Sequence, residues 1–395
     1  MKLYNEQALK ESKEANCGRP YRQCSVSVMD TIADPDITFD ENGVSNYYNI
    51  FHHYDKMYNI EPEQRKQKLQ QLVAEIKSRS RSGSKYDSVL GISGGVDSSY
   101  LALFAKQLGL NPLLVHFDYG WNSEIAVSNI ENISKHTGFD LYTYVIDWEQ
   151  FKELQRSYFK ASVLDLDVPA DHLIFGALHD VTKKFKIQSI LNGNNYVTEC
   201  ILPLSWNYNK FDLVNLKDIH YTYSKMSLNR LPLLGFFESL RYSLLHKIKQ
   251  YSLLNYTPYD KFKVIEEIKS ELHWKDYGGK HFESVFTRFY QGYILPVKFN
   301  IDKRKAHLSN LIFSGSITKE KAMEVLAQPV YPVNLQQEDY EYMAKKLSFE
   351  PAEWERILTQ PNKKHTEFKT DAHLWRRYHR LLRSTSSFRK IFKKK

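Results

Sequence analysis

The chain has 395 residues, 42% of them hydrophobic, which is enough for two domains with ordinary globular cores. It contains no apolar run near the roughly 18 residues that span a bilayer, and its start has no hydrophobic signal core. Its three cysteines are too few and too scattered for a disulfide framework, so we expect a cytoplasmic protein in a reducing compartment.

The net charge of +9 is concentrated at the carboxyl-terminal end. Residues 376–395 carry nine Lys and Arg side chains and no acidic one, so the rest of the chain is balanced. The basic character is therefore poor evidence for a body that binds nucleic acid. Aromatic and aliphatic residues alternate with these cations, as in a basic amphipathic helix. A solvated helix, a partner contact and peripheral contact with the inner face of an inner membrane all remain open.

Residues 1–80 form an N-terminal extension that begins irregularly, with turn-forming residues around the short extended run at 37–39. A charged helix is predicted over residues 62–79, where apolar residues recur at helical spacing. The following stretch, residues 79–85, is rich in Ser and Gly and is typical of a linker.

An alternation of strands and helices follows in residues 81–215, the first predicted domain. Strands are predicted over 88–92, 112–117, 141–146 and 188–191, and helices over 98–108, 124–136 and 171–185. This alternation predicts an α/β fold with a parallel sheet covered by helices on both faces. Such sheets bind ligands beyond the carboxyl ends of their strands.

Helical, aromatic-rich segments dominate beyond about residue 205, so we predict a helical substrate or partner domain over residues 216–350. Its predicted segments lie at 229–250, 258–273, 281–291 and 318–327. Residues 351–395 are predicted to form a helical basic tail.

A glycine- and serine-rich loop lies between the first predicted strand and helix. Its residues are Ser93, Gly94, Gly95, Val96, Asp97, Ser98 and Ser99. Glycines let the backbone approach a ligand, and the start of the next helix attracts an anion. Asp97 would repel phosphate unless a cation lies between them, which indicates Mg²⁺. The loop lacks the Lys of a Walker A motif. It resembles the PP-loop of the ATP pyrophosphatases, which holds pyrophosphate while AMP is transferred; an ordinary Gly/Ser turn is the alternative.

Other residues fall at the same predicted sheet edge. His116, Phe117 and Asp118 end the second strand, where PP-loop proteins hold adenosine, although ordinary strand-end residues would look the same. The stretch 192–195 follows a later strand, and its Gly193 and Asn194 are candidates for lining the nucleotide or for a simple turn. Glu199 is a candidate to hold Mg²⁺ together with Asp97.

The wider sequence resembles the N-acetyl sugar amidotransferases of the WbpG and PseA type. The resemblance runs from about residue 20 to 350 and is most specific in the block Asp-Tyr-Gly-Gly-Lys-His-Phe-Glu-Ser at 276–284. Other matching stretches are 30–44, 118–122, 167–172, 192–199, 287–293 and 302–304. It implies a PP-loop domain of the adenine nucleotide alpha hydrolase-like fold with a helical C-terminal domain.

The chain departs from this family at one point. Family members carry two Cys-x-x-Cys pairs with the spacing of a zinc site, whereas the matching positions here are Cys24, Ser27, Ser45 and Tyr48. Hydroxyl groups are poor zinc ligands. We therefore expect no structural zinc and predict that packing holds this lobe together.

The resemblance implies a reaction that converts the acetamido group of a sugar to an acetamidino group. The sugar would belong to a bacterial surface polysaccharide, such as the O-antigen of lipopolysaccharide, or to flagellin, and both a nucleotide-linked and a free sugar remain open. ATP and Mg²⁺ are the implied cofactors, because AMP transferred to the amide oxygen makes a leaving group that ammonia displaces. Nothing in the sequence resembles a glutaminase, so we expect glutaminase-like and cyclase-like partner subunits to supply ammonia.

The C-terminal domain is expected to complete the site. Lys280 would neutralise phosphate, and His281 or Glu283 would orient ammonia or remove a proton; a helix start with buried caps is the alternative. Lys303 and Arg304 would grip polyphosphate or the nucleotide part of the sugar, unless they form a solvated turn.

Asp171 and His172 open a helix near the sheet edge, where Asp171 is more typical of a helix cap than of a catalytic group.

Two other functions remain open. A PP-loop tRNA-modifying enzyme would use the basic tail for RNA contact, but thiolating members need paired cysteines and Cys200 has no evident partner in the sequence. A non-catalytic scaffold would keep the loop only to bind nucleotide.

Overall fold

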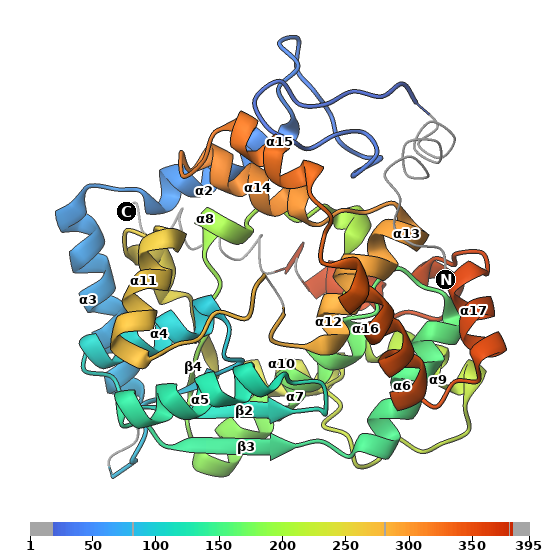
Figure 1. Cartoon of the computed structure of the whole chain (residues 1–395). Helices are drawn as coiled ribbons and strands as arrows, with labels where there is room; N and C mark the ends of the chain where they lie inside the picture. Colours follow the sequence, from blue (N-terminus) through green and yellow to red (C-terminus); the bar gives the residue numbers. More distant parts are fainter. Residues whose placement is uncertain (1–18, 81–82, 280–281, 379, 382–395) are drawn as a thin grey trace.

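The computed structural model describes residues 19–80, 83–279, 282–378 and 380–381. Its centre is a five-stranded sheet in the order β3-β2-β1-β4-β5, in which every neighbouring pair is parallel. Figure 1 shows this sheet at one end of the molecule. The strands are β1 (Ser88–Gly91), β2 (Pro112–Asp118), β3 (Leu141–Val145), β4 (Ser189–Leu191) and β5 (Lys249–Tyr251).

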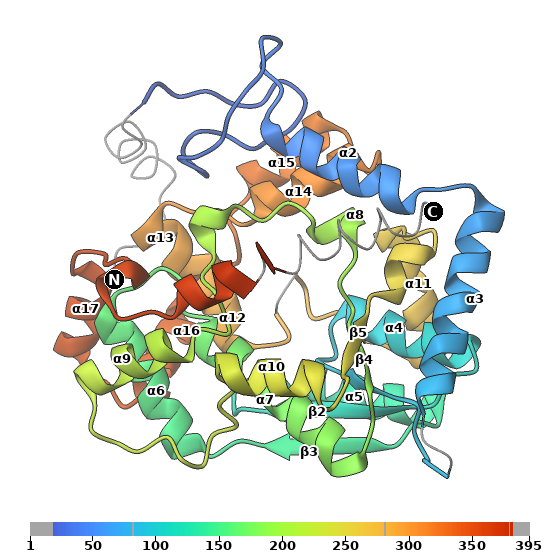
Figure 2. The same cartoon turned by 180° about the vertical axis from the view of Figure 1, so that it is seen from behind.

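Helices cover both faces of the sheet because successive strand residues point to opposite sides. Leu90 packs in a core with α4 (Val96–Gln107), α5 (Glu124–Thr137) and α11 (Lys261–Leu272). Its neighbour Val89 packs in a second core against α7 (Val168–Phe185). Figure 2 shows α7 and α10 (Phe236–Leu244) on the face turned away in Figure 1. The predicted α/β fold is confirmed.

The fifth strand corrects the predicted helix at 229–250 and the domain boundary at residue 215. Helix α10 ends at Leu244, and Lys249–Tyr251 then pairs in parallel with β4. Only Tyr251 of this short edge strand is buried, so its sequence has no apolar run to indicate a strand. The sheet domain therefore includes a segment from the region predicted as wholly helical.

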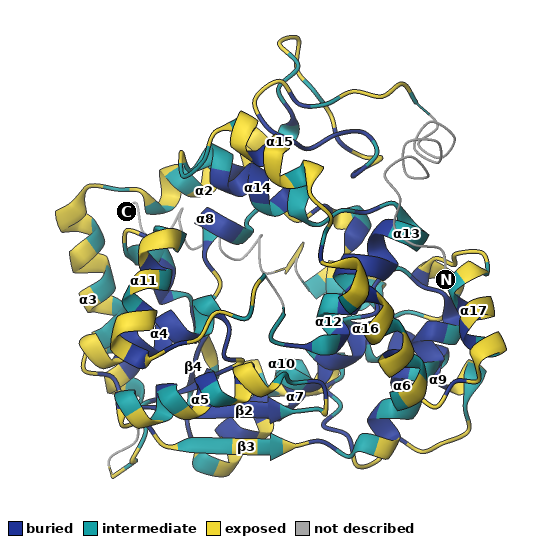
Figure 3. Ribbon diagram, in the orientation of Figure 1, coloured by how far each residue is buried: buried dark blue, intermediate teal, exposed yellow. Residues whose placement is uncertain are grey.

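The region after residue 282 is helical, as predicted. Its elements are α12 (Val285–Phe289), a π-helical turn (Tyr290–Ile294), α13 (Leu295–Phe299), α14 (Arg304–Phe313), α15 (Lys319–Ala327), α16 (Val333–Lys346) and α17 (Pro351–Thr359). Two helices that precede them in the chain, α6 (Trp148–Ala161) and α9 (Leu213–Tyr223), pack with them around Trp121, Phe286 and Trp354. Figure 3 shows the buried faces of α6, α12 and α16 turned toward this shared core. The C-terminal helices thus share this core with residues of the first predicted domain, while the two cores on the faces of the sheet are separate from it.

The first part of the predicted tail packs against the rest of the protein. Lys363 forms a bridge with Val163 beside α6, and the Asn215 amide donates to the carbonyl oxygens of His365 and Lys369 at 2.9 and 3.0 Å. Trp375 then packs its ring 5.6 Å from that of Phe211. The predicted tail at 351–395 is therefore docked over its described part, and residues 382–395 lie outside the described residues. Among the helices described, none is both long and apolar enough to cross a membrane.

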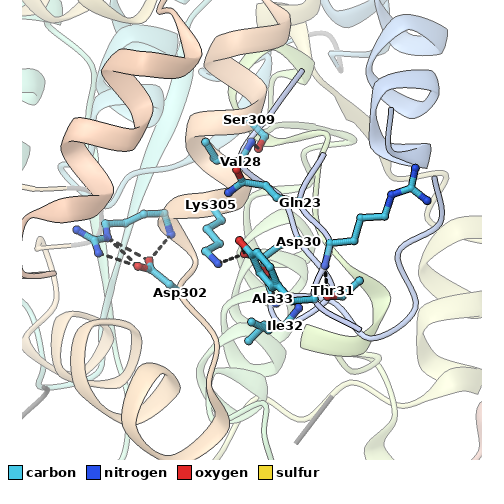
Figure 4. A network of polar contacts seen from close by, with 12 residues as sticks. Gln23, Val28, Asp30, Thr31, Ile32, Ala33, Asp302, Lys305 and Ser309 are labelled. Atoms are coloured by element: carbon cyan, nitrogen blue, oxygen red, sulfur yellow. Dashed lines mark hydrogen bonds and ion pairs between the residues drawn. The ribbon is translucent and has the colours of Figure 1, made fainter. Parts of the chain in front are cut away.

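An N-terminal lobe of residues 19–45 sits on α14 and α15 and leads into α2 (Asn46–Tyr58) and α3 (Pro62–Arg79). Asp30 is 1% exposed and forms an ion pair with Lys305. The backbone N–H of Val28 donates to Ser309 Oγ at 3.3 Å. Figure 4 shows these contacts between the lobe and α14.

The degenerate cysteine positions lie inside this lobe. Cys24, Ser27 and Ser45 are fully buried, and the Ser45 N–H donates to Cys24 Sγ at 3.3 Å. Burial opposes ionisation of the Cys24 thiol, but hydrogen bonds from Ser27 and Ser45 bring its pKa below the ordinary value. Tyr48 instead places its ring 5.5 Å from that of Phe313 on α14. Packing, hydrogen bonds and the Asp30–Lys305 ion pair connect the lobe to α14, and the absence of a structural zinc stays a prediction.

Candidate active site

The loop between β1 and α4 has a shape that requires glycine. Gly94 has φ +76°, and a Cβ at this position would lie 2.6 Å from the carbonyl oxygen of Ala126. The Gly94 carbonyl accepts hydrogen bonds from Trp274 Nε1 at 2.8 Å and from the Asn129 amide at 3.5 Å. Helix α4 begins directly after Gly95, so the loop meets the positive end of that helix. The expected anion-binding geometry is in place.

Serine hydroxyls fix the loop from inside. Ser99 Oγ is fully buried and donates to the Gly95 carbonyl at 2.6 Å, while Ser93 Oγ accepts from the Gly95 N–H at 3.2 Å. The loop borders a cavity of about 460 Å³ lined by Ser93, Gly95, Val96, Asp97 and Ser98. Gly94 and Ser99 are not among these lining residues, and their contacts described above support the loop from within the fold; their predicted contacts with the ligand stay predictions.

Asp97 is held by two donors from distant parts of the chain. Its Oδ1 accepts from Asn195 Nδ2 at 3.1 Å and from the hydroxyl of Tyr259. Tyr259 is 8% exposed, and burial beside this carboxylate raises its pKa, so the phenol keeps its proton. Sequence reasoning missed Tyr259, because no local pattern marks a tyrosine that contacts the loop from so far along the chain.

A second cavity of about 870 Å³ adjoins the first at the carboxyl ends of the strands. Five residues line both cavities: Ser93, Gly193, Asn194, Glu199 and Glu283. Gly193 lies against the loop, since a Cβ there would be 3.3 Å from the carbonyl carbon of Asp97. The structure thus brings the predicted residues Gly193, Asn194 and Glu199 to the phosphate loop.

The three residues at the end of β2 have different surroundings. His116 and Phe117 line the larger cavity as predicted, and burial lowers the pKa of His116, so its imidazole is neutral near neutral pH. Asp118 instead shapes the turn after β2, with its carboxylate accepting from the Gly120 N–H at 3.1 Å. Its predicted role in holding the nucleotide is therefore corrected to a structural one.

The C-terminal domain reaches the site through backbone pairing. The Ser123 N–H donates to the Glu283 carbonyl at 2.8 Å, and the Val285 N–H donates to the Trp121 carbonyl at 2.9 Å. These bonds place Glu283 where the two cavities meet, as its predicted role requires. The predicted residues Lys280 and His281 lie outside the described residues.

The two residues predicted to bind substrate, Lys303 and Arg304, have different surroundings. Lys303 lines the larger cavity, with its Nζ 4.0 Å from a carboxylate oxygen of Asp167. Arg304 bonds to Asp302 and to the carbonyl oxygens of Val325 and Gln328 at the end of α15, at 3.1 and 2.8 Å. This geometry corrects the role predicted for Arg304, because its guanidinium ties α14 to α15.

Helix α7 also differs from its prediction at its start. It begins at Val168 with Asp167 at the cap, so Asp171 lies in the first turn, where it lines the larger cavity. His172 is 1% exposed, and burial lowers its pKa to about 4. Its Nε2 accepts from the Leu234 N–H at 3.0 Å, which makes His172 a structural residue.

Asp97 and Glu199 are two of the four acidic residues that line the cavity beside the loop, and their carboxylates suit a magnesium ion that also binds phosphates. Within the described part of the chain, no group of three or more His, Cys, Asp or Glu side chains is placed to hold a metal. Mg²⁺ typically needs only one or two protein carboxylates when substrate phosphates and water complete its shell. The residues present therefore suit Mg²⁺ carried with ATP.

Two family models match separate segments of the chain. The family model "Queuosine biosynthesis protein QueC" matches residues 87–172, and "LPS biosynthesis protein WbpG-like, C-terminal domain" matches residues 283–382. The second match extends past residue 350, where the sequence resemblance was expected to end, and includes part of the predicted tail. A search of curated proteins finds no match.

Several solved structures are similar to part of the chain. NMN synthetase from Francisella tularensis is 12% identical over 58% of this chain and 93% of its own, with a TM-score of 0.30. U34-tRNA thiolase NcsA from Methanococcus maripaludis is 15% identical over 66% and 80%, with a TM-score of 0.31. NH3-dependent NAD synthetase from Campylobacter jejuni is 14% identical over 54% and 94%, with a TM-score of 0.29.

The loop geometry and the two family matches lead to one conclusion. The loop, the parallel sheet and the QueC match belong to the same segment of the chain. The helices that close the site carry the other match. The protein is thus a PP-loop protein of the ATP-using kind that carries a WbpG-like C-terminal domain.

Proposed function

We propose that the protein is an ATP-dependent amidotransferase that converts the acetamido group of a bacterial surface sugar to an acetamidino group. The observation that carries this proposal is the position of Glu283. It comes from the WbpG-like region and lines both the phosphate-loop cavity and the larger cavity. A bond broken at the α-phosphate of ATP would lie at this junction, with pyrophosphate on one side and the acceptor on the other.

The reaction needs an activated amide, because nitrogen donates into the carbonyl and makes it a poor electrophile. The amide oxygen attacks the α-phosphorus and pyrophosphate leaves into the loop cavity, where Ser93, Ser98 and the start of α4 receive its charge. Mg²⁺ held by Asp97 and Glu199 would offset charge on the phosphates. Ammonia then adds to the amide carbon, and the original amide oxygen leaves with AMP.

The second step releases protons, since ammonia carries more of them than the imino nitrogen of the product. Of the two carboxylates that line both cavities, Glu199 is assigned to Mg²⁺, and Glu283 is the one we propose to accept a proton. Lys280 and His281 keep their predicted roles as proposals, with Lys280 neutralising phosphate and His281 orienting ammonia.

The ammonia source and the location are also proposals. We expect separate glutaminase-like and cyclase-like subunits, since most free ammonia is protonated at neutral pH. The basic residues 376–395 would contact an anionic membrane surface. Deleting only these residues should abolish binding to vesicles containing an anionic lipid, and unchanged binding would end the membrane proposal.

One experiment tests the function. The protein is incubated with ATP, Mg²⁺, ammonium and a panel of acetamido sugars, free and nucleotide-linked, whose amide oxygen carries ¹⁸O. We expect the label to appear in AMP. We also expect the sugar product to be lighter than the labelled amide, because an NH group replaces the ¹⁸O atom. AMP without label, or AMP formation that requires tRNA, would refute the proposal.

A further inference from the structure

The larger cavity has two halves of different chemistry. The half next to the sheet, called the apolar half below, has Ile92, Val115, Leu178 and Leu191 on its wall, with polar residues such as His116 and Asn192 at the strand ends. The half formed by the start of α7 and by the C-terminal helices is lined by Asp167, Asp171, Ser284, Thr287, Gln291 and Lys303. An adenine ring suits the apolar half, which lies at the strand ends beside the phosphate loop. The polar half is then left for the second substrate.

Asp167 is a partly buried carboxylate whose two described side-chain contacts are both long. Its side chain is 16% exposed, whereas that of Asp171 is 43% exposed and pairs with Lys210 at 3.3 Å. The Asp167 carboxylate accepts from Gln291 Nε2 at 3.4 Å and lies 4.0 Å from Lys303 Nζ, and both separations are long. Burial raises the pKa of Asp167 to about 6, in keeping with this weak pairing.

The remaining capacity of Asp167 favours a ligand with hydroxyl donors. A carboxylate accepts at about four lone-pair positions, so two long contacts leave room for more. Asp167 and Asp171 lie one helical turn apart on α7 and face a single cavity lysine, Lys303, so this half disfavours an anion. A neutral, hydroxyl-rich group fits better than a phosphate.

We propose that this polar half is the acceptor subsite, and that Asp167 sets its specificity by accepting a hydrogen bond from a hydroxyl group of a sugar. This inference rests on the proposed function, because it takes the acceptor to be a polyhydroxylated amide. Asp167 acts here in binding, while the reacting amide lies nearer Glu283 at the junction of the cavities.

The variant Asp167→Asn tests the subsite. Asn is an equally good helix-capping residue, and the Asp167 side chain makes no cap hydrogen bond in α7, so we expect the variant to fold. The matched control is Asp180→Asn, the same change at an exposed position on the same helix. Thermal melting of both variants checks their folding. Thr287→Val, which removes one cavity hydroxyl at constant size, is a second variant if Asp167→Asn fails to fold.

Binding is measured by calorimetry with an ATP analogue that resists cleavage at the α-phosphate. The probes are N-acetylglucosamine, N-acetylmannosamine and their UDP-linked forms. We expect at least one sugar to bind the wild type, and Asp167→Asn to weaken that binding about 10- to 150-fold, the range for a hydrogen bond to a charged group. Asp180→Asn should leave sugar binding unchanged, and neither change should alter binding of the ATP analogue. The Thr287→Val loss should be smaller, about fivefold.

Three outcomes would overturn the inference. These are equal sugar binding by the wild type and Asp167→Asn, no binding of any of the four sugars by the wild type, and a loss in Asp167→Asn confined to the ammonium dependence of turnover. The proposed function fails on a different result, the absence of labelled AMP, so the two failures are distinguishable.

Discussion

The contact between Tyr259 and Asp97 gives a direct test of how the phosphate loop works. Asp97 Oδ1 has two donors, the Tyr259 hydroxyl and Asn195 Nδ2 at 3.1 Å. Tyr259→Phe removes one donor and keeps the ring that packs against Tyr100, with centroids 5.9 Å apart. A hydrogen bond to a charged group contributes about 1.5–3 kcal/mol. If Asp97 must be held in one orientation to bind Mg²⁺ with ATP, kcat/KM for ATP should fall about 10- to 150-fold.

The assay is the initial rate of AMP release at varied ATP concentration, with saturating ammonium and acceptor. Tyr86→Phe is the matched control, because Tyr86 also donates to a carboxylate, that of Asp140 at 2.6 Å, but far from both cavities. It should lose similar stability and keep wild-type kinetics. A Tyr259→Phe enzyme within twofold of the wild type, or an equal loss in Tyr86→Phe, would refute the reasoning.

Three further predictions concern the site and the fold. Asp97→Ala should abolish AMP release without unfolding the protein, as circular dichroism would confirm; retained activity would contradict the loop assignment. Gly176→Ala should destabilise the fold by more than about 4 kcal/mol, because its Cβ would lie 1.8 Å from the Pro232 carbonyl oxygen, and denaturant unfolding measures this loss. Burial and the Asp212 carboxylate raise the pKa of Asp371 from 3.8 to about 7, so its stabilising effect is complete at low pH and is lost as pH rises to 7. Asp371→Asn should therefore gain stability over the wild type between pH 4 and 7, and a pH-independent difference in melting temperature would contradict this.

The strands that the sequence predicts are those with continuous apolar runs. Strands β1 and β2 are buried along their length, and their runs are visible without a structure. Strand β5 was missed because an edge strand of three residues needs only one buried side chain, Tyr251. The wrong domain boundary follows from the same cause, since nothing local shows that residues 249–251 rejoin the sheet.

In the site, too, the features formed by neighbouring residues could be predicted, and those formed by residues far apart in the chain could not. The phosphate loop is encoded by neighbouring residues, because glycines and serines shape the backbone where they stand. Tyr259 reaches Asp97 across a separation of 162 residues, which no spacing rule can reveal. The prediction that Arg304 binds substrate was wrong for a related reason. The charged triplet at 302–304 gives no sign that the Arg304 guanidinium donates hydrogen bonds to backbone carbonyls at the end of α15. The sequence also singles out Lys303, which lines the larger cavity, but not its neighbour there, Asp167.

The ion pair between Asp30 and Lys305 has a consequence for how the protein is made. A carboxylate that is 1% exposed cannot be buried before its cation is available, because an unpaired buried charge is strongly unfavourable. Lys305 is synthesised 275 residues after Asp30. On the ribosome, at roughly 5–20 residues per second, that interval lasts on the order of 15–60 s. The lobe at the amino terminus is therefore among the last parts of the chain to fold, and it stays open to chaperones and proteases for most of synthesis.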